Sequence, residues 1–439
     1  MFLFCPSIFL DRSGKTTFLN ALTGGLDSSV SSSGDLHSSD GDQLISEKIA
    51  FIYQEDSFFS QLTVRETLQL AASLRLYDSV SQTLISEIIQ YLALTHVADS
   101  LVGDIISRGI SGGERKRLAV GCEMLGTAPS LLVADEPSSG LDSFQAKQVV
   151  LLLRKIAIEK NIAVVCAIHQ PRSSIWSIFD DILLLGPGGV VIYHGSRDHA
   201  LAYFASIGHH CPPDTNPAEF LIDLVSFDQQ SPEASSQRIK SLSEAFSASK
   251  SYAVSLVDPT THLPILKIKP VLPTTLWWGP RRAVFRFLIL LKRALRQTLR
   301  DNATNLTRLA VSSVLAALLG SMYGGKDNIS STLDSNTVAK RVNLIAHASI
   351  NVGMLSMVKA LQLFKRERAV VDRERSLGRY SAVEYLAAKL CAELPFDAIV
   401  GAVSRLLHQW TSHVSFFIIY LLSTTLVLSA VSDVWIHCS

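Results

Sequence analysis

"FLDRSGKTTFLNAL", residues 9–22, is the stretch that decides the fold of the first half of this 439-residue chain. It ends as the phosphate-binding pattern G-x-x-x-x-G-K-[ST] does, in which glycines let backbone N–H groups fold around phosphates. Lys15 can contact the β- and γ-phosphates of a nucleotide, Thr16 can ligate Mg²⁺, and the helix that follows has an N-terminus that favours anions. Phe9 replaces the first glycine of the pattern. The stretch therefore predicts a nucleotide site with an unusual loop.

Short apolar runs alternate with helical patterns through residues 1–225, as is typical of an α/β domain with a largely parallel sheet. One run, "SLLVADEP" at 130–137, is a buried strand that would deliver Asp135 to Mg²⁺ and let Glu136 polarise the attacking water. Three further runs are expected to be buried strands that end in loops: "IAFIYQ" at 49–54, "IAVVCAIHQ" at 162–170 and "DILLLGPGGVVIYHG" at 181–195.

A second phosphate-binding element is predicted in "ISGGERKR", residues 110–117. Ser111 offers a hydroxyl, and Gly112 and Gly113 offer unobstructed backbone N–H groups just before a helix. One domain does not need two such elements for a single γ-phosphate. We therefore expect two domains to pair head to tail, each completing the nucleotide site of the other.

Taken together, these motifs resemble an ATP-binding-cassette (ABC) ATPase, a P-loop NTPase, and they follow the order of that family. The resemblance implies ATP and Mg²⁺ as cofactors. It assigns catalytic roles to Gln54 in the Q-loop, to Glu136 and to the switch histidine His169, and it places the metal at Thr16, Gln54 and Asp135. Nucleotide binding is assigned to the partial Walker A motif, the signature motif and the D-loop: Ser13, Gly14, Lys15, Thr16, Thr17, Ser111, Gly112, Gly113, Glu114 and Asp142.

Longer stretches narrow the resemblance to the White-type G subfamily, in which the cassette precedes the membrane domain. They include "IHQPRSSIW" at 168–176, the stretch 193–224 that contains "NPAEFLIDL", and "FKRERAVVDRERSLGRYSAVEYLAAKLCAELPF" at 364–396. The implied fold is an α/β ABC nucleotide-binding domain followed by an all-α polytopic transmembrane domain. The expected divisions are the cassette at 1–225, a linker at 226–280, an amphipathic connecting helix at 281–304, and a partial ABC-2 type transmembrane domain of about four helices at 305–439.

The connecting segment carries arginines along one face of a predicted helix and apolar residues along the other. Such a helix usually lies on a membrane surface or packs on a partner. The arginines are Arg282, Arg286, Arg293, Arg296 and Arg300, and the apolar residues are Phe285, Leu288, Leu291 and Leu295.

Four segments are candidate membrane spans: 306–323, 342–363, 383–407 and 414–431. The last contains no charge and has the length that a span requires. In 383–407, Lys389, Glu393 and Asp397 share one helix face, so they either pair at the cytoplasmic mouth of a bundle or belong to an interfacial helix.

Basic residues indicate the orientation of this half. Eight Lys or Arg lie between Arg281 and Arg308 and six lie in 365–379, whereas the 324–341 loop has three. The positive-inside rule therefore predicts a multi-pass integral membrane protein with its ATP-binding domain in the cytosol. The target membrane stays open.

Two departures from the family pattern affect this interpretation. Phe9 and Arg12 stand where the family has glycines, and the twelve preceding residues leave no expected room for the upstream strand and its base-stacking aromatic residue. The sequence also stops after four candidate spans. Either the chain is a degenerate partner subunit, or the sequence is truncated at both ends. Because Gln54, Glu136 and His169 are intact, we favour truncation.

Three classes of function compete. The leading hypothesis is half of a dimeric transporter, a homodimer or heterodimer in a lipid bilayer, that exports a lipid, sterol, pigment or drug-like compound. The second is a soluble ABC ATPase that acts in translation or DNA repair, and the apolar segment 414–431 argues against it. The net charge of +1 gives no reason to expect nucleic acid as a partner. The third is a catalytically silent partner or non-transporting fragment. The fold does not determine the cargo.

Overall fold

A computed structural model describes residues 4–9, 14–23, 49–76, 81–104, 108–125, 129–228, 230–249, 280–323 and 367–408, with short helical pieces between 339 and 358. The chain divides into two units. The first unit comprises Met1–Asp56, Val80–Ser100 and Ile110–Leu272, and the second comprises Ser57–Ser79, Leu101–Gly109 and Pro273–Ser439.

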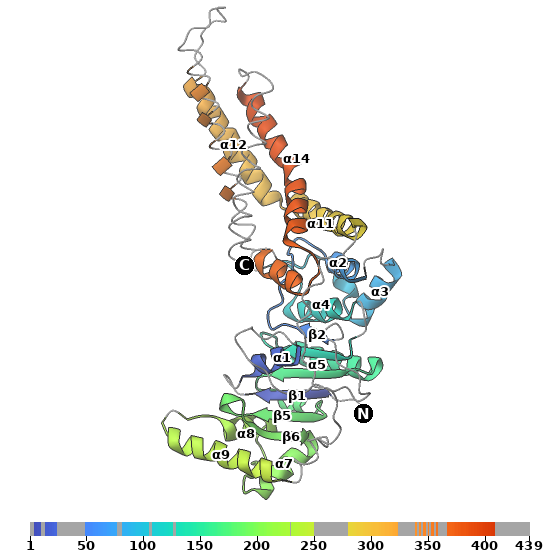
Figure 1. Cartoon of the computed structure of the whole chain (residues 1–439), viewed down its shortest axis with the longest axis vertical. Coiled ribbons are helices and arrows are strands. Elements are labelled where there is room, and N and C mark those ends of the chain that lie inside the picture. The colour runs from blue at the N-terminus through green and yellow to red at the C-terminus, as the bar shows by residue number, and fades with distance from the viewer. Residues whose placement is uncertain are drawn as a thin grey trace, which may run out of the picture. The chain divides into compact units, whose positions relative to one another are not determined.

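The first unit is built on a six-stranded sheet with the order β2-β3-β4-β1-β5-β6 (Figure 1). All neighbouring strands are parallel except β5 and β6, so the expected α/β domain with a largely parallel sheet is confirmed. Parallel strands place their carboxyl ends at one edge of the sheet, where α/β proteins bind ligands. The strands are β1 Phe4–Phe9, β2 Ile49–Ile52, β3 Leu131–Asp135, β4 Ala163–Ile168, β5 Asp181–Leu185 and β6 Val191–Ser196.

Two expectations about these strands are corrected. A strand does precede the phosphate-binding loop: β1 pairs with both β4 and β5, and Ser7 lies opposite Ala167 on one side and Leu183 on the other. The six residues of β1 suffice because both neighbours supply backbone partners. The stretch 181–195, expected as one strand, forms the antiparallel pair β5 and β6, since the turn Pro187–Gly189 reverses the chain.

Helices pack around this sheet, and one of them lies within the segment expected as a linker. Apolar residues at 239, 242 and 246 recur at helical spacing, and they are buried in α9, Pro232–Ala248. Phe246 contacts Tyr193 and Tyr203 with ring centroids 6.0 and 6.1 Å apart. Part of the predicted linker is therefore a folded element of the first unit. The other α-helices there are α1 Lys15–Thr23, α3 Gln82–Tyr91, α4 Gly112–Met124, α5 Ser143–Lys160, α6 Ser173–Trp176, α7 Arg197–Ser206 and α8 Pro217–Val225.

The second unit is helical and has its own core. α11 and α14 lie side by side, α14 also contacts α12, and α2 contacts α11 (Figure 1). Phe59, Leu290, Val371, Tyr380 and Tyr385 are among the buried residues of this core. Its named helices are α2 Val64–Leu76, α11 Pro280–Arg300, α12 Asn302–Tyr323 and α14 Ala382–His408, and residues 367–376 are also helical.

The orientation of α11 differs from the usual one for a basic amphipathic helix. Arg286 and Arg293 are buried, whereas Leu288 is 54% exposed. The reason is electrostatic: Arg286 pairs with Glu384 at 2.9 Å, and further carboxylates in this unit receive other arginines of the helix. The middle of the arginine face, Arg286 and Arg293, therefore packs inside the unit, whereas Arg282 and Arg300 at its ends are exposed, as is part of the apolar face.

Within the described ranges, no helix is both long enough and apolar enough to cross a membrane. The candidate span 306–323 lies in α12, and 383–407 lies in α14. The candidate 342–363 is described only in short pieces, and 414–431 lies outside the described residues.

Candidate functional site

The phosphate-binding loop ends at the N-terminus of α1. Gly14 has a φ of +84°, a backbone conformation that is strained for residues with a Cβ. Its carbonyl accepts the first helical hydrogen bond from the Phe18 amide at 2.8 Å. Lys15 and Thr16 therefore occupy the first turn of α1, and the N-terminus of a helix favours phosphate. Thr17 is exposed beside them, and Ser13 lies outside the described residues.

Five of the predicted site residues converge at the carboxyl end of β3. The Thr16 hydroxyl donates to Asp135 Oδ2 at 2.9 Å. Lys15 Nζ pairs with Glu136 Oε1, and Gln54 Nε2 donates to Glu136 Oε2 at 2.9 Å. The loop after β2, the start of α1 and the end of β3 thus meet around two carboxylates, as the sequence predicts.

The Asp135 carboxylate fits a divalent cation. Burial raises the pKa of this carboxyl, and the neighbouring Glu136 charge raises it further, while the Thr16 hydrogen bond lowers it. Its Oδ1 atom is buried and has no hydrogen-bond partner among the described residues. A hard cation such as Mg²⁺ takes oxygen ligands, which Asp135, the Thr16 hydroxyl and the Gln54 amide oxygen offer.

Glu136 has a strained backbone that sets its direction. Its φ is +45°, an unusual value for a residue with a side chain. The Glu136 amide donates to the Ala167 carbonyl at 2.9 Å, which ties the end of β3 to β4. The same strand pair therefore fixes the residue that the sequence assigns to the attacking water.

His169 follows the neighbouring strand β4 and is exposed at the same edge of the sheet. The next residue, Gln170, has a φ of +46°. The Asn216 amide Nδ2 donates to the Pro171 carbonyl at 2.9 Å, while its Oδ1 caps α8 by accepting from the Ala218 amide at 3.3 Å. Sequence reasoning missed Asn216. The Asn-Pro pair predicts a helix start, but nothing local shows that this cap also holds the histidine loop.

The signature residues form a second cluster at the N-terminus of α4. Ser111 and Glu114 make a reciprocal capping box, and His96 Nε2 lies 2.7 Å from Glu114 Oε1. Burial raises the pKa of Glu114, but hydrogen bonds from the Ser111 amide and hydroxyl and from His96 outweigh it, so the net direction is downward. The capping box leaves the start of α4 with a fixed geometry.

The D-loop is tied to this cluster. The Gly113 amide donates to Gln145 Oε1 at 3.2 Å, and Asp142 Oδ1 caps α5 by accepting from the Phe144 and Gln145 amides at 2.9 Å each. A Cβ on Gly113 would come within 3.0 Å of Gln145 Oε1, so glycine permits this approach. Gly112 and Asp142 are exposed, so the N-termini of α4 and α5 lie at the surface.

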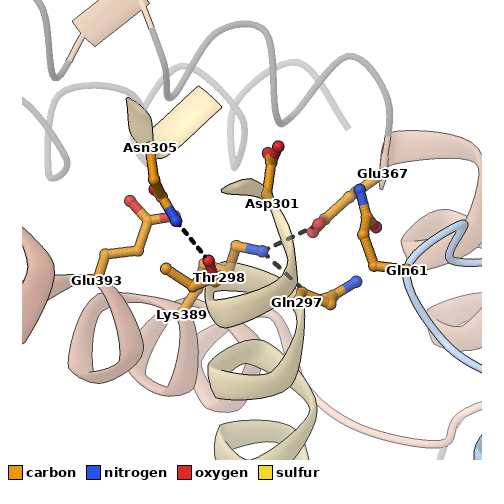
Figure 2. A pocket seen from close by; sticks show the side chains of 8 residues that line it. All are labelled: Gln61, Gln297, Thr298, Asp301, Asn305, Glu367, Lys389 and Glu393. Atoms are coloured by element: carbon orange, nitrogen blue, oxygen red, sulfur yellow. Dashed lines mark hydrogen bonds and ion pairs between the residues drawn. The ribbon is translucent and has the colours of Figure 1, made fainter. Parts of the chain in front are cut away.

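The second unit contains a polar pocket of about 20 Å³, enough for about one water molecule (Figure 2). Lys389 Nζ donates to Glu367 Oε1 at 2.9 Å and lies 3.5 Å from Gln297 Oε1. Lys389 thus pairs with a carboxylate from another segment. Its pairing with Glu393, which lines the same pocket, stays a prediction, and the side chain of Asp397 lies outside the described residues. The pocket is lined by Gln61, Gln297, Thr298, Asp301, Asn305, Glu367, Lys389 and Glu393.

Three family models match parts of the chain. A family model described as ABC transporter matches residues 13–139, and two described as ABC-2 type transporter match residues 169–260 and 286–437. ABC transporter G family member 7 of Arabidopsis thaliana is 42% identical over 417 residues, which cover 89% of this chain and 55% of that protein. The broad substrate specificity ATP-binding cassette transporter ABCG2 of Rattus norvegicus is 33% identical over 374 residues, which cover 78% of this chain and 54% of that protein.

The chain thus spans just over half the length of these two relatives. Among solved structures, an ATP-binding cassette of an ABC transporter in its ADP conformation is similar, with a TM-score of 0.37 and 19% identity over 45% of this chain and 83% of that chain.

Proposed function

We propose, because the chain belongs to the G subfamily of ABC transporters, that its first unit hydrolyses ATP to drive export of a hydrophobic substrate across a membrane. The observation that supports this most directly is the convergence of Lys15, Thr16 and Gln54 on the carboxylates of Asp135 and Glu136. These are the side chains that grip phosphates, hold a metal and orient water in phosphoryl transfer.

Each residue has a definite task in this proposal. Lys15 and the N-terminus of α1 bind the β- and γ-phosphates of ATP. Asp135, Thr16 and the Gln54 amide oxygen would hold Mg²⁺, which would supply positive charge to balance the phosphates. Glu136 accepts the proton of the attacking water, and His169 contacts the γ-phosphate from the end of β4.

The signature cluster supports a dimer. Ser111, Gly112, Gly113 and Glu114 lie at the start of α4, where the helix dipole favours an anionic group, and Asp142 lies at the start of α5. We infer that they bind the nucleotide held by the partner of a head-to-tail dimer, either a second copy or another G-subfamily half-transporter.

The membrane half completes the proposal. The ABC-2 type model matches residues 286–437, and the basic residues in 281–308 and 365–379 support a cytosolic first unit. One relative, the rat transporter ABCG2, is named for its broad substrate specificity. We propose a hydrophobic substrate class for this chain: lipid, sterol, pigment or drug-like.

The test is ATP hydrolysis by the full-length protein in lipid nanodiscs. Glu136→Gln should keep ATP binding and lower the hydrolysis rate by about 10²-fold or more, because the general base is lost. Glu244→Gln, on the exposed face of α9, is the matched control. Equal hydrolysis by the two variants would refute the role of Glu136 and with it the proposed active site.

A silent partner subunit is the second candidate, favoured by Phe9 and Arg12 at the glycine positions of the loop. In that case the purified chain would bind ATP and hydrolyse it only when co-assembled with another half-transporter. Hydrolysis by the chain alone, lost in Glu136→Gln, would exclude this candidate.

A further inference from the structure

Lys116 is a buried lysine that no motif-based role explains. It lies in the second turn of α4, and the residue is 2% exposed. Its Nζ has three acceptors in the segment that follows β2: the Gln54 carbonyl at 2.7 Å, the Tyr53 carbonyl at 3.0 Å and Asp56 Oδ1 at 3.1 Å. The three donor positions of a lysine are thereby used on one short loop.

We propose that Lys116 is a positioning residue that fixes the Q-loop, residues 53–56, against the signature helix α4 and so holds Gln54 at the hydrolytic site. This inference rests on the proposed ATPase function. A chain of direct contacts carries it: Lys116 binds the Gln54 carbonyl, and the Gln54 side chain donates to Glu136 Oε2 at 2.9 Å. The backbone anchor and the functional amide belong to the same residue.

Burial makes this anchor strong and selective. The Lys116 and Asp56 side chains are 3% and 9% exposed, so solvent cannot replace the lost partner when one of them is removed. A carbonyl left unpaired inside the protein carries a desolvation penalty, which the loop would avoid by moving toward water. Loss of Lys116 donors therefore releases the Q-loop, and Gln54 with it.

The position of Lys116 in α4 has a consequence for a dimer. The same helix begins with Gly112 and Gly113, which we assign to the partner's nucleotide. Because a helix moves as a rigid element, a displacement of its N-terminus is transmitted to the Q-loop through Lys116. The nucleotide site of one chain is thereby coupled to the nucleotide site of its partner, which the signature motif of the first chain completes.

Amide hydrogen exchange on the full-length protein tests the anchor without requiring activity. Lys116→Met keeps an unbranched side chain one heavy atom shorter and removes its donors, and Lys160→Met makes the same change at the exposed end of α5. We expect faster exchange confined to residues 53–57 in Lys116→Met and wild-type exchange in the control. Unchanged exchange there would overturn the inference. If amide exchange in Lys116→Met is faster throughout the protein, Asp56→Asn provides the milder variant, and we expect its faster exchange at the same residues.

Steady-state kinetics tests the consequence for catalysis. Lys116→Met should lower kcat by on the order of 10–100-fold through misplacement of Gln54, with the KM for ATP near the wild-type value, and Lys116→Arg should recover part of the loss. In the Gln54→Ala background, Lys116→Met should have little further effect, because both changes remove the same interaction. Multiplicative losses would show a merely structural role. If the wild-type protein does not hydrolyse ATP, the proposed function is refuted. The exchange test of Lys116 stays valid in that case, because it does not require activity.

Discussion

Removal of the Arg293 guanidinium should strongly destabilise the second unit. The residue is 3% exposed and pairs with the buried Glu374 at 2.8 Å. Tyr380 also donates to Glu374, and the guanidinium lies 4.3 Å from the ring centroid of Phe59. Arg293→Met removes the cation that pairs with the buried Glu374 carboxylate and leaves only the charge of Arg379 to balance it, which costs about 3–5 kcal/mol. The lost cation–π contact adds roughly 0.5–2 kcal/mol.

Thermal unfolding of the purified full-length protein measures this effect. At about 2–4 °C per kcal/mol for a unit of this size, the total loss of about 3.5–7 kcal/mol should lower the melting temperature by roughly 7–28 °C. The double variant Arg293→Met/Glu374→Met should recover much of the loss, because it removes the isolated charge as well. Lys240→Met is the control: its pair with Glu244 spans 3.9 Å, both side chains are more than two-thirds exposed, and it should cost at most about 1 kcal/mol. A melting temperature for Arg293→Met equal to that of the control would refute the buried pair.

Three further changes probe the first unit. Asp135→Asn should raise the melting temperature in magnesium-free buffer, because burial raises the pKa of Asp135 and its charged form opposes folding. The gain should increase as the pH rises above about 4, where the carboxyl of the unfolded chain loses its proton. The same variant should abolish magnesium-dependent hydrolysis. Asn216→Asp keeps the cap of α8 but loses the donor to Pro171, so unfolding should cost about 1–3 kcal/mol less and hydrolysis should slow. Gly113→Ala brings a Cβ within 3.0 Å of Gln145 Oε1 and should cost about 1–3 kcal/mol in thermal denaturation.

The parts of the site that depend on local pattern could be predicted from the sequence. An apolar run that ends in two acids predicts a buried strand with carboxylates at its end, and β3 delivers Asp135 and Glu136 in this way. The G-K-T-T run predicts a helix start, and α1 begins at Lys15. Parallel pairing then brings these ends to one edge, so the contacts of Thr16 and Lys15 with the two acids follow from the topology.

The parts that depend on distant partners could not be predicted. The sequence pattern of α11 is equally compatible with arginines that are exposed to water and with arginines that pair with carboxylates. Arg286 and Arg293 are buried because they pair with Glu384 and Glu374, which lie more than 80 residues away in the sequence. Lys116 likewise resembles any solvated lysine of a helix until the segment after β2 is placed against it. In both cases a long-range ion pair, which no local pattern shows, accounts for how the helix is oriented.

Backbone strain supplies an independent argument for the location of the site. Among the described residues, four that are not glycine have positive φ. Two of them lie just beyond neighbouring strands: Glu136 is the first residue after β3, and Gln170 is the second residue after β4. Such conformations cost of order 1–3 kcal/mol each and persist where the surrounding contacts over-determine them. Glu136 is held by its amide bond to Ala167 and by side-chain bonds from Lys15 and Gln54. The fold thus stabilises a strained backbone at the residue that would activate water, which is expected if selection acts on the direction of its carboxylate.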